Sequence, residues 1–390
     1  MNEQRHVVTA EPENSEMPLE SLRSWVTSNR LFFVRNHFGV PTIDRDAWRL
    51  SIAGQVSRPL EINWDQLAAM PERTVFATME CAGNGRSFLS PHAHGVQWGA
   101  GAVGHAEWTG VPLRLILEEA GLSATASEIV CEGADRGSEA DHPEEMPFAR
   151  SLPLAKALDR DTLVATRMNG ELLEPNHGAP ARLLVPGWYG VASVKWLSRI
   201  AAIDRPFGGY FQTKKYTIER QTGAGLERQI VGPMAVKSEI IRPRPGDVLG
   251  VGTNRVFGVA WAGDDAVARV EISTDGGNSW TSAELVGPTA RYSWTLWEYL
   301  WETGESGPHT ILARAISARG AVQPLEHDAL NGGYLIHHSR PCAVRVAATQ
   351  RVLATSADEQ TLMYDMAWFA EENSRRPLDV ELEFTAGAGI

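Results

Sequence analysis

Strand-sized segments recur about every ten residues through the later part of the chain, with turn residues between them. The clearest cover Val256–Trp261, Val267–Ser273, Arg291–Leu296 and His309–Ser317. Inside one of them, Val270 and Ile272 alternate with Arg269 and Glu271, and Asp275-Gly276-Gly277 follows as a hairpin turn. The spacing predicts an all-β, immunoglobulin-like sandwich domain over residues 235–346.

The earlier part, about 29–220, mixes short helices with short strands. Asn63–Met70 is predicted to be a helix because Asn63 can cap it, Gln66 stands three residues on, and Pro71 stops it. Pro112–Ala120 carries apolar residues on one face. Strands are expected over Thr74–Met79, Arg182–Val185 and Val191–Trp196. The irregular order predicts a mixed α+β domain rather than a doubly wound sheet.

Charge and apolar patterning exclude two classes of partner. The chain has 48 acidic and 36 basic residues and a net charge of −12, so we expect no nucleic-acid binding. No run approaches the roughly 18 apolar residues of a membrane span, and Met1–Glu20 lacks the features of a secretory signal. We therefore expect a cytoplasmic protein. Residues 347–390 form an acidic extension with a predicted helix over 357–373, and the extension indicates no function.

The three cysteines form no Cys-x-x-Cys pair, which argues against a disulfide framework, a zinc knot and a covalently attached haem. Cys81 stands apart because it ends an apolar strand and enters the loop Ala82-Gly83-Asn84-Gly85, with Arg86 five residues on. That setting suits a stabilised thiolate that acts as nucleophile or metal ligand. A small buried hydrophobe is the alternative reading, and it is the one we adopt for Cys131 and Cys342.

Two further segments are rich in hydrogen-bond donors. Phe32–His37 places an arginine, an asparagine and a histidine together, as an oxyanion or phosphate site requires. His177-Gly178-Ala179-Pro180-Ala181-Arg182 is followed by Ser193-Val194-Lys195, so several cations could converge on one polyanion. Taken singly, the first segment could be a solvated strand edge and the second scattered surface charge.

Phe32–His37, the loop that begins at Cys81 and the segments from His177 to Lys195 together resemble the molybdenum-cofactor domain of the sulfite oxidase family, in its bacterial haem-free form. The region around Trp261 and Trp280 resembles the family's dimerisation domain. The resemblance implies a molybdopterin-binding domain of the sulfite oxidase fold, with Cys81 as the molybdenum ligand. It also implies cofactor contacts from Phe33, Val34, Arg35, Asn36, His37, Asp135, His177, Arg182, Ser193, Val194 and Lys195, and catalytic roles for Arg35, Cys81, Arg86, Trp98 and Tyr216.

The implied reaction is molybdenum-dependent oxidation of sulfite to sulfate by oxygen-atom transfer. Electrons would pass to an external acceptor such as a cytochrome or dioxygen, since the chain shows no haem or flavin motif. A reductase acting on nitrate or a sulfoxide with the same cofactor is the alternative, and a non-catalytic binding protein with a decayed pocket is a second. A homodimer is expected from the second domain, whose tryptophans are Trp261, Trp280, Trp294, Trp297 and Trp301. Most of them are expected in the sandwich core, and some could form a self-complementary apolar patch.

One segment departs from the family pattern. Animal sulfite oxidases place an arginine of the second domain in the substrate pocket, but the corresponding turn here, Ala260–Ala266, contains Asp264 and Asp265 and no arginine. An acidic turn there is expected to weaken the anion site, so either the substrate is not sulfite or another cation substitutes. Lys214 and Lys215 are the nearby candidates.

Overall fold

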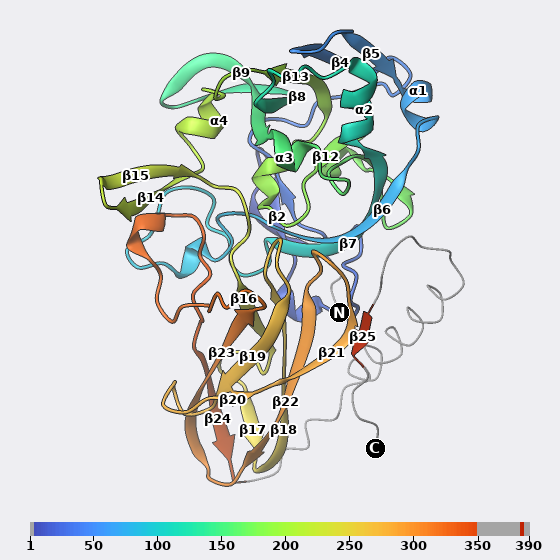
Figure 1. Cartoon of the computed structure of the whole chain (residues 1–390). Helices are drawn as coiled ribbons and strands as arrows, with labels where there is room; N and C mark the ends of the chain where they lie inside the picture. Colours follow the sequence, from blue (N-terminus) through green and yellow to red (C-terminus); the bar gives the residue numbers. More distant parts are fainter. Residues whose placement is uncertain (1–3, 349–382, 386–390) are drawn as a thin grey trace.

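The computed structural model describes residues 4–348, with the backbone of 383–385. A mixed α+β domain lies above an all-β domain in Figure 1, and the strand β7 crosses the boundary region between them. The helix expected at 357–373 lies outside the described residues. Among the described residues, no helix is long and apolar enough to span a membrane.

Two five-stranded sheets form most of the first domain. In one, the strands run β11-β10-β7-β6 with β12 paired to β10, and in the other β5-β4-β13-β8-β9. Their bounds are β4 Arg49–Gly54, β5 Leu60–Asn63, β6 Arg73–Glu80, β7 Val103–Pro112, β8 Glu128–Glu139, β9 His142–Pro153, β10 Leu163–Met168, β11 Glu171–Leu172, β12 Arg182–Leu184 and β13 Leu197–Ile203. Strand β13 pairs with β4 in parallel and with β8 antiparallel, so the sheet is mixed, as the α+β prediction requires.

The helices of the first domain are short, and both predicted ones are present. Helix α1, Trp64–Ala68, begins with a capping box in which Asn63 and Gln66 bond each other's backbone N–H. Helix α2, Leu113–Ala120, buries its apolar face and ends at Gly121, whose φ is 68°. The other helical segments of the described residues are, in the N-terminal segment and the first domain, η1 Leu19–Ser21, η2 Arg86–Phe88, α3 Leu154–Ala157, η3 Pro175–His177, η4 Gly190–Ala192 and α4 Tyr210–Thr213. In the second domain there is η5 Ala329–Asn331.

The strand predicted over Val191–Trp196 is wrong. Its first residues belong to the turn η4, and Trp196 has a φ of 49°. Side chains satisfy part of the backbone there: the Ser193 hydroxyl accepts a hydrogen bond from Val185 N, and Arg182 donates to the carbonyl of Ser193. The segment therefore turns around Arg182 instead of extending along a sheet.

The second domain is a sandwich of two five-stranded sheets, in the orders β16-β18-β22-β21-β25 and β17-β24-β23-β19-β20. Their bounds are β16 Lys237–Arg242, β17 Val248–Gly250, β18 Gly252–Trp261, β19 Val267–Ser273, β20 Thr281–Ser282, β21 Glu284–Thr289, β22 Thr295–Thr303, β23 Gly307–Ser317, β24 Cys342–Ala347 and β25 Glu383–Thr385. The strand expected from Arg291 begins only at Thr295, because Tyr292 has a φ of 68° and turns the chain. The predicted sandwich is otherwise present.

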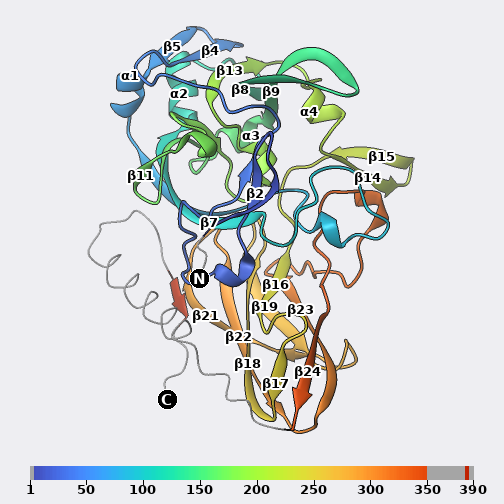
Figure 2. The ribbon, with the colours of Figure 1, turned by 180° about the vertical axis from the view of Figure 1, so that it is seen from behind.

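The N-terminal segment fills the junction between the domains, as seen from behind in Figure 2. Strands β1 His6–Thr9, β2 Asn14–Glu16 and β3 Val34–Arg35 form a small sheet, and η1 contacts β16. One hydrophobic core runs through both domains and contains Trp25, Trp261 and Trp294. Trp297 and Trp301 are buried within the sandwich. Trp261, Trp294, Trp297 and Trp301 are therefore core residues, as expected for most of the second-domain tryptophans, and they form no surface patch.

A hairpin leaves the first domain directly after Tyr216. Its strands are β14 Thr217–Thr222 and β15 Gly225–Ile230, which pair only with each other among the described strands. Arg220 anchors the hairpin to the second domain through Asn331, at 2.6 Å, and Asp328, at 3.6 Å. The hairpin thus links the Tyr216 region to η5.

Candidate active site

Cys81 follows the last residue of β6, where the chain leaves the sheet in a tight turn. Its N–H donates to Ala102 O at 2.8 Å, and its carbonyl accepts from Asn84 N at 2.9 Å. Gly85 has a φ of 95°, a conformation that favours glycine and lets the loop turn into η2. These bonds fix the backbone around the thiol, which lines a cavity of the first domain.

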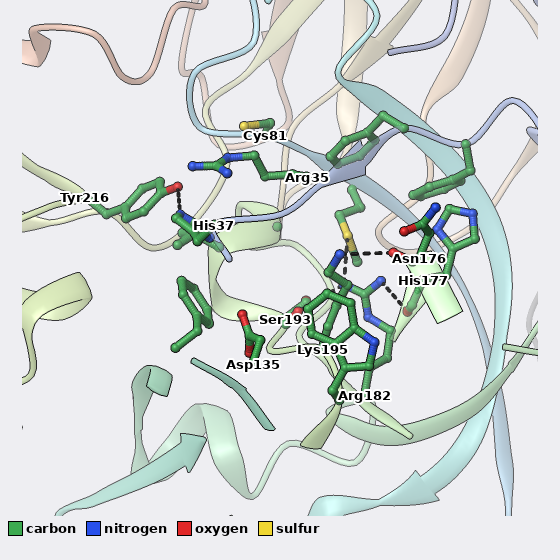
Figure 3. Close-up of a pocket in the computed structure, with 17 residues that line it drawn as sticks. Arg35, His37, Cys81, Asp135, Asn176, His177, Arg182, Ser193, Lys195 and Tyr216 are labelled. Carbon is green, nitrogen blue, oxygen red and sulfur yellow. Dashed lines mark hydrogen bonds between the residues drawn. The ribbon is translucent and has the colours of Figure 1, made fainter. Parts of the chain in front are cut away.

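The cavity encloses about 640 Å³, including its open mouth, and Figure 3 shows its two ends. One, here called the thiol end, holds Cys81, Arg35, His37 and Tyr216. The other, the cationic end, holds Asn176, His177, Arg182 and Lys195. Asp135 and Ser193 lie between them in the view. Of the predicted site residues, those that line the cavity are Phe33, Arg35, His37, Cys81, Asp135, His177, Arg182, Ser193, Lys195 and Tyr216.

The cationic end holds more positive than negative charge. Arg182 donates to the carbonyls of His177 and Ser193 at 3.1 and 2.9 Å, and Lys195 donates to the Asn176 carbonyl at 3.0 Å and to the Asn36 side chain. Burial lowers the pKa of Arg182 to about 9 and holds that of Lys195 well below its ordinary value. The carboxyl group in the cavity lining, Asp135, has its pKa raised to about 7 by burial. Buried cations of this kind are stabilised by an anionic ligand.

Two buried donors at this end are unpaired. Arg182 Nε and Asn36 Nδ2 have no hydrogen-bond partner among the described residues. Buried polar atoms are rarely left unsatisfied, and a bound group is one explanation for those that are. His177 is a neutral neighbour, since burial lowers its pKa to about 3. Because phosphate oxygens accept hydrogen bonds from such donors, the cationic end fits a phosphate-bearing cofactor such as molybdopterin.

At the thiol end, His37 and Tyr216 form a hydrogen bond of 2.6 Å between Nε2 and the phenol oxygen. Burial, with Arg35 and Lys195 nearby, holds the pKa of His37 well below its ordinary value, and burial raises that of Tyr216. Both side chains are therefore neutral near pH 7. Arg35 brings a positive charge to the same end, bonded to Asn14 Oδ1 at 3.2 Å.

The thiol itself differs from the expected stabilised thiolate. Burial raises the pKa of Cys81, and this effect outweighs the opposing influence of Arg35 and Arg86. The protein alone therefore leaves the thiol protonated at neutral pH. Coordination to a metal displaces that proton, since a coordinating thiol is deprotonated. No cluster of three His, Cys, Asp or Glu residues suited to a metal occurs in the described part of the chain.

Five predicted residues lie outside the cavity lining: Val34, Asn36, Arg86, Trp98 and Val194. Val34 and Val194 are buried apolar side chains, and Asn36 lies behind Lys195. Trp98 is fully buried in the hydrophobic cluster that also contains Cys81. Their assigned roles stay predictions, with the Asn36 role supported by its contact to Lys195.

Arg86 also lies outside the lining, and its guanidinium is already engaged. It donates to the Gly333 carbonyl through two nitrogens, at 2.7 and 3.0 Å, and to the Val96 carbonyl at 2.8 Å. Tyr334 lies beneath it, 5.4 Å from ring centre to guanidinium carbon, and Tyr334 also packs 5.0 Å from the Tyr216 ring. Arg86 thus holds a loop of the second domain beside the thiol end.

The acidic residues of the turn Ala260–Ala266, Asp264 and Asp265, do not line the cavity. Asp264 accepts hydrogen bonds from Lys156 Nζ at 2.8 Å and Trp188 Nε1 at 3.2 Å, and so it anchors the turn to the first domain. The turn therefore adds no carboxylate to the cavity wall, and the expected weakening of the anion site stays a prediction. Lys215 pairs with Glu139 and Asp141, and neither it nor Lys214 lines the cavity.

Sequence reasoning missed Asn176 and Tyr334. The Asn176 carbonyl accepts a hydrogen bond from Lys195. Because Asn176 directly precedes the predicted site residue His177, its position in the sequence could have identified it. Tyr334 comes from the second domain, and its hydroxyl lies 3.4 Å from Tyr216 N across 118 residues of sequence. No local pattern identifies such a contact.

Comparison with known proteins gives the same picture as the geometry. Residues 37–211 match the oxidoreductase molybdopterin binding domain, and residues 228–331 the Mo-co oxidoreductase dimerisation domain. Mitochondrial sulfite oxidase of Drosophila melanogaster is 35% identical over 349 residues, covering 82% of this chain and 60% of the relative. Sulfite oxidase of Gallus gallus is 34% identical over 342 residues, covering 82% and 72% respectively. The chain therefore spans about 60% of the length of the fly relative.

A solved structure shares nearly the whole described architecture. The crystal structure of the sulfane dehydrogenase SoxCD from Paracoccus pantotrophus aligns with a TM-score of 0.76 and 30% identity, and the alignment covers 87% of each chain. The similarity thus includes both domains and their order.

Proposed function

The chain belongs to the sulfite oxidase family of molybdenum-cofactor oxidoreductases, and we propose that it oxidises sulfite to sulfate by oxygen-atom transfer, passing electrons to an external acceptor. The observation that carries the proposal is the arrangement of the cavity. A single buried thiol faces Arg35 and Tyr216, and a cluster of buried cations lies at the opposite end. A large cofactor and a small anion would each have a matching surface there.

Different residues of the cavity would hold the metal and the organic part of the cofactor. When bound, the molybdenum cofactor supplies two-electron oxygen-atom transfer. Cys81 offers the soft anionic sulfur donor that a high-valent metal requires. Arg182, Lys195 and Ser193 line the cavity and offer donors to the pterin and its phosphate. Asn36, whose amide nitrogen is unpaired among the described residues, accepts a hydrogen bond from Lys195. The buried Asp135, largely protonated below its pKa of about 7, can donate a hydrogen bond to the same group.

A small oxyanion would bind at the thiol end. Arg35 supplies the attraction that the chain as a whole, with its net charge of −12, does not. With its proton on Nε2, the neutral ring of His37 donates to the Tyr216 oxygen over 2.6 Å. The phenol proton of Tyr216 is then free to donate to a substrate oxygen. Burial keeps both groups neutral, so this donor stays available across the neutral pH range.

Two partners follow from the same proposal. The second domain, whose residues match the dimerisation domain, supports a homodimer. The electron acceptor is external in this scheme, a small cytochrome or dioxygen. Light scattering at micromolar concentration tests the first point, and a purely monomeric mass would contradict it.

The substrate is tested with the molybdenum-loaded enzyme and ferricyanide as acceptor. We expect sulfite to reduce ferricyanide in a saturable manner, with one sulfate formed for every two ferricyanide ions reduced. The competing outcome is an oxo-transfer reductase. If a reduced viologen is oxidised by nitrate or a sulfoxide, and sulfite gives no ferricyanide reduction, the cofactor assignment survives and the sulfite proposal fails.

A further inference from the structure

The two residues that flank Cys81 in the sequence both contact the second domain. Glu80 precedes the thiol, and Ala82 follows it. We propose that the second domain positions Cys81, acting through Lys237 and Trp261 on one side and the loop 333–335 on the other. The inference rests on the proposed role of Cys81 as molybdenum ligand, and it assigns the second domain a task in the site besides dimerisation.

Glu80 is one side of this contact. Successive side chains of a strand point to opposite faces, so Glu80 at the end of β6 faces away from the cavity that Cys81 lines. Its carboxylate is 2% exposed. Lys237 Nζ of β16 lies 2.9 Å from Oε1, and Trp261 Nε1 of β18 donates to Oε2 at 3.0 Å. Both donors belong to the second domain.

The same carboxylate also holds the cysteine loop. Asn84 Nδ2 donates to Glu80 Oε1 at 3.1 Å, while Asn84 Oδ1 accepts from Ala102 N at 3.0 Å and Asn84 N donates to Cys81 O at 2.9 Å. The loop therefore closes on a carboxylate whose position Lys237 and Trp261 determine.

Beyond Lys237, opposite charges alternate outward to the surface. Lys237 lies 3.3 Å from Glu239 Oε1, and Arg340 lies 2.5 Å from Glu239 Oε2. Lys237 and Glu239 are buried, and Arg340 is about a quarter exposed and stacks on Phe88, with 4.1 Å from guanidinium carbon to ring centre. Burial raises the pKa of Glu239, but Arg340 and Lys237 outweigh this and hold it below its ordinary value. Glu80, Lys237 and Glu239 thus each have an oppositely charged neighbour in this row.

The loop 333–335 forms the other side. Leu335 N donates to the carbonyl of Ala82 at 2.9 Å, and Arg86 donates to the carbonyl of Gly333. Cys81 therefore lies between two attachment points on a separate domain. An unpaired buried carboxylate is costly, so removing Lys237 should make the loop rearrange to hydrate Glu80. A rearranged loop moves or exposes the thiol.

The test compares two lysines that each pair with a carboxylate across the domain boundary. Lys237→Met removes a partner of the buried Glu80, whereas Lys156→Met removes a partner of Asp264, whose side chain is about a third exposed and lies outside the cavity. The full-length apoprotein is treated with a thiol reagent, and labelling of Cys81 is followed by peptide mass spectrometry. We expect Lys237→Met to label at least about tenfold faster than wild type and Lys156→Met to label within about twofold. Equal rates in Lys237→Met and wild type, or equal acceleration in both variants, would overturn the proposal.

Two more conservative variants, Trp261→Phe and Trp294→Phe, test the proposal if Lys237→Met fails to fold. Trp261→Phe keeps a buried ring and removes only the donor to Glu80, and Trp294→Phe removes an equally buried indole donor that bonds Trp25 O instead. We expect faster Cys81 labelling in Trp261→Phe alone. If Trp294→Phe accelerates labelling as much, the second domain contributes only general stability, and the proposal is wrong.

A spectroscopic readout on the loaded enzyme separates this inference from the proposed function. Displacement of the sulfur ligand changes the electron paramagnetic resonance signal of the one-electron-reduced metal. We expect that signal to shift in Trp261→Phe and to match wild type in Trp294→Phe. If Cys81→Ser retains molybdenum and the wild-type signal, the ligand assignment fails whatever the labelling rates; if only the labelling and the Trp261→Phe signal are unchanged, positioning fails and the ligand assignment stands.

Discussion

Trp25 and Trp294 exchange hydrogen bonds: each indole nitrogen donates to the other residue's backbone carbonyl, at 3.1 and 2.8 Å. Trp25 belongs to the N-terminal segment and Trp294 to the turn that enters β22, so the pair joins that segment to the sandwich domain. Both side chains are fully buried. His105 of β7 packs 4.3 Å from the Trp25 ring and 5.5 Å from that of Trp294.

His105 makes the stability of this junction sensitive to acid. Its ring bonds Trp25 O through Nδ1 and Ser293 Oγ through Nε2, both at 2.9 Å. Burial lowers its pKa from 6.5 to about 3. Between about pH 3 and pH 6.5, the His105 ring is therefore protonated in the unfolded chain and neutral in the folded chain. The stability contributed by the neutral ring is complete above about pH 6.5 and is lost as the pH falls toward 3, by up to about 1.4 kcal/mol per pH unit.

We expect the free energy of unfolding to fall less steeply between pH 6.5 and 4 in His105→Gln than in wild type. Denaturant titrations at several pH values measure this slope. His94→Gln removes an exposed histidine and is the matched control, with the wild-type slope expected. An unchanged slope in His105→Gln would contradict the assignment of a buried neutral ring.

Arg35 is predicted to bind the anionic substrate. In Arg35→Gln we expect KM for sulfite to rise about 10- to 100-fold, because a hydrogen bond to a charged group contributes about 1.5–3 kcal/mol. Steady-state ferricyanide reduction measures the change, and molybdenum content is determined in parallel because Arg35 lines the cofactor cavity as well. Arg45→Gln, at an exposed position, serves as control. A wild-type KM in fully loaded Arg35→Gln would remove Arg35 from the substrate site.

Tyr216 and Tyr334 offer a matched pair of phenols. Their rings lie 5.0 Å apart, but only the Tyr216 hydroxyl bonds His37 and lines the cavity. Tyr216→Phe should lower kcat by about 100-fold, the usual effect of losing a donor to developing oxyanion charge. Tyr334→Phe should change kcat by less than about threefold, since its hydroxyl accepts only a long bond from Tyr216 N. Similar losses in both variants would assign Tyr216 a packing role.

Local signals account for what the sequence predicted well. Helix α1 was predictable because Asn63 and Gln66 complete a capping box within four residues, and α2 because its apolar positions share one face. The cavity lining was largely predictable for a similar reason. Its residues cluster in short segments around Cys81, His177 and Lys195, and the order of those segments resembles a known family.

Contacts between distant residues account for what the sequence did not reveal. Lys237 meets Glu80 across 157 residues, and nothing in either local sequence indicates the other. Arg86 appeared to be a free cation near the thiol, but its guanidinium holds carbonyls of Gly333 and Val96. Tryptophan enrichment indicated a core within the sandwich domain, whereas the core that buries Trp261 and Trp294 continues into the first domain. In each case the contact joins residues of two domains, so it depends on how the domains pack and not on the local sequence.

The central claim is that Cys81 holds molybdenum in a sulfite-oxidising site. The most direct measurement is the molybdenum content of purified wild type and Cys81→Ser, together with sulfite-dependent ferricyanide reduction. Cys342→Ser is the control, since Cys342 is a buried thiol of the second domain whose bond to Pro243 O a hydroxyl can retain. We predict about one molybdenum per chain with turnover in wild type and Cys342→Ser, and loss of turnover with at least about tenfold less metal in folded Cys81→Ser. Full metal content and turnover in Cys81→Ser would contradict the account.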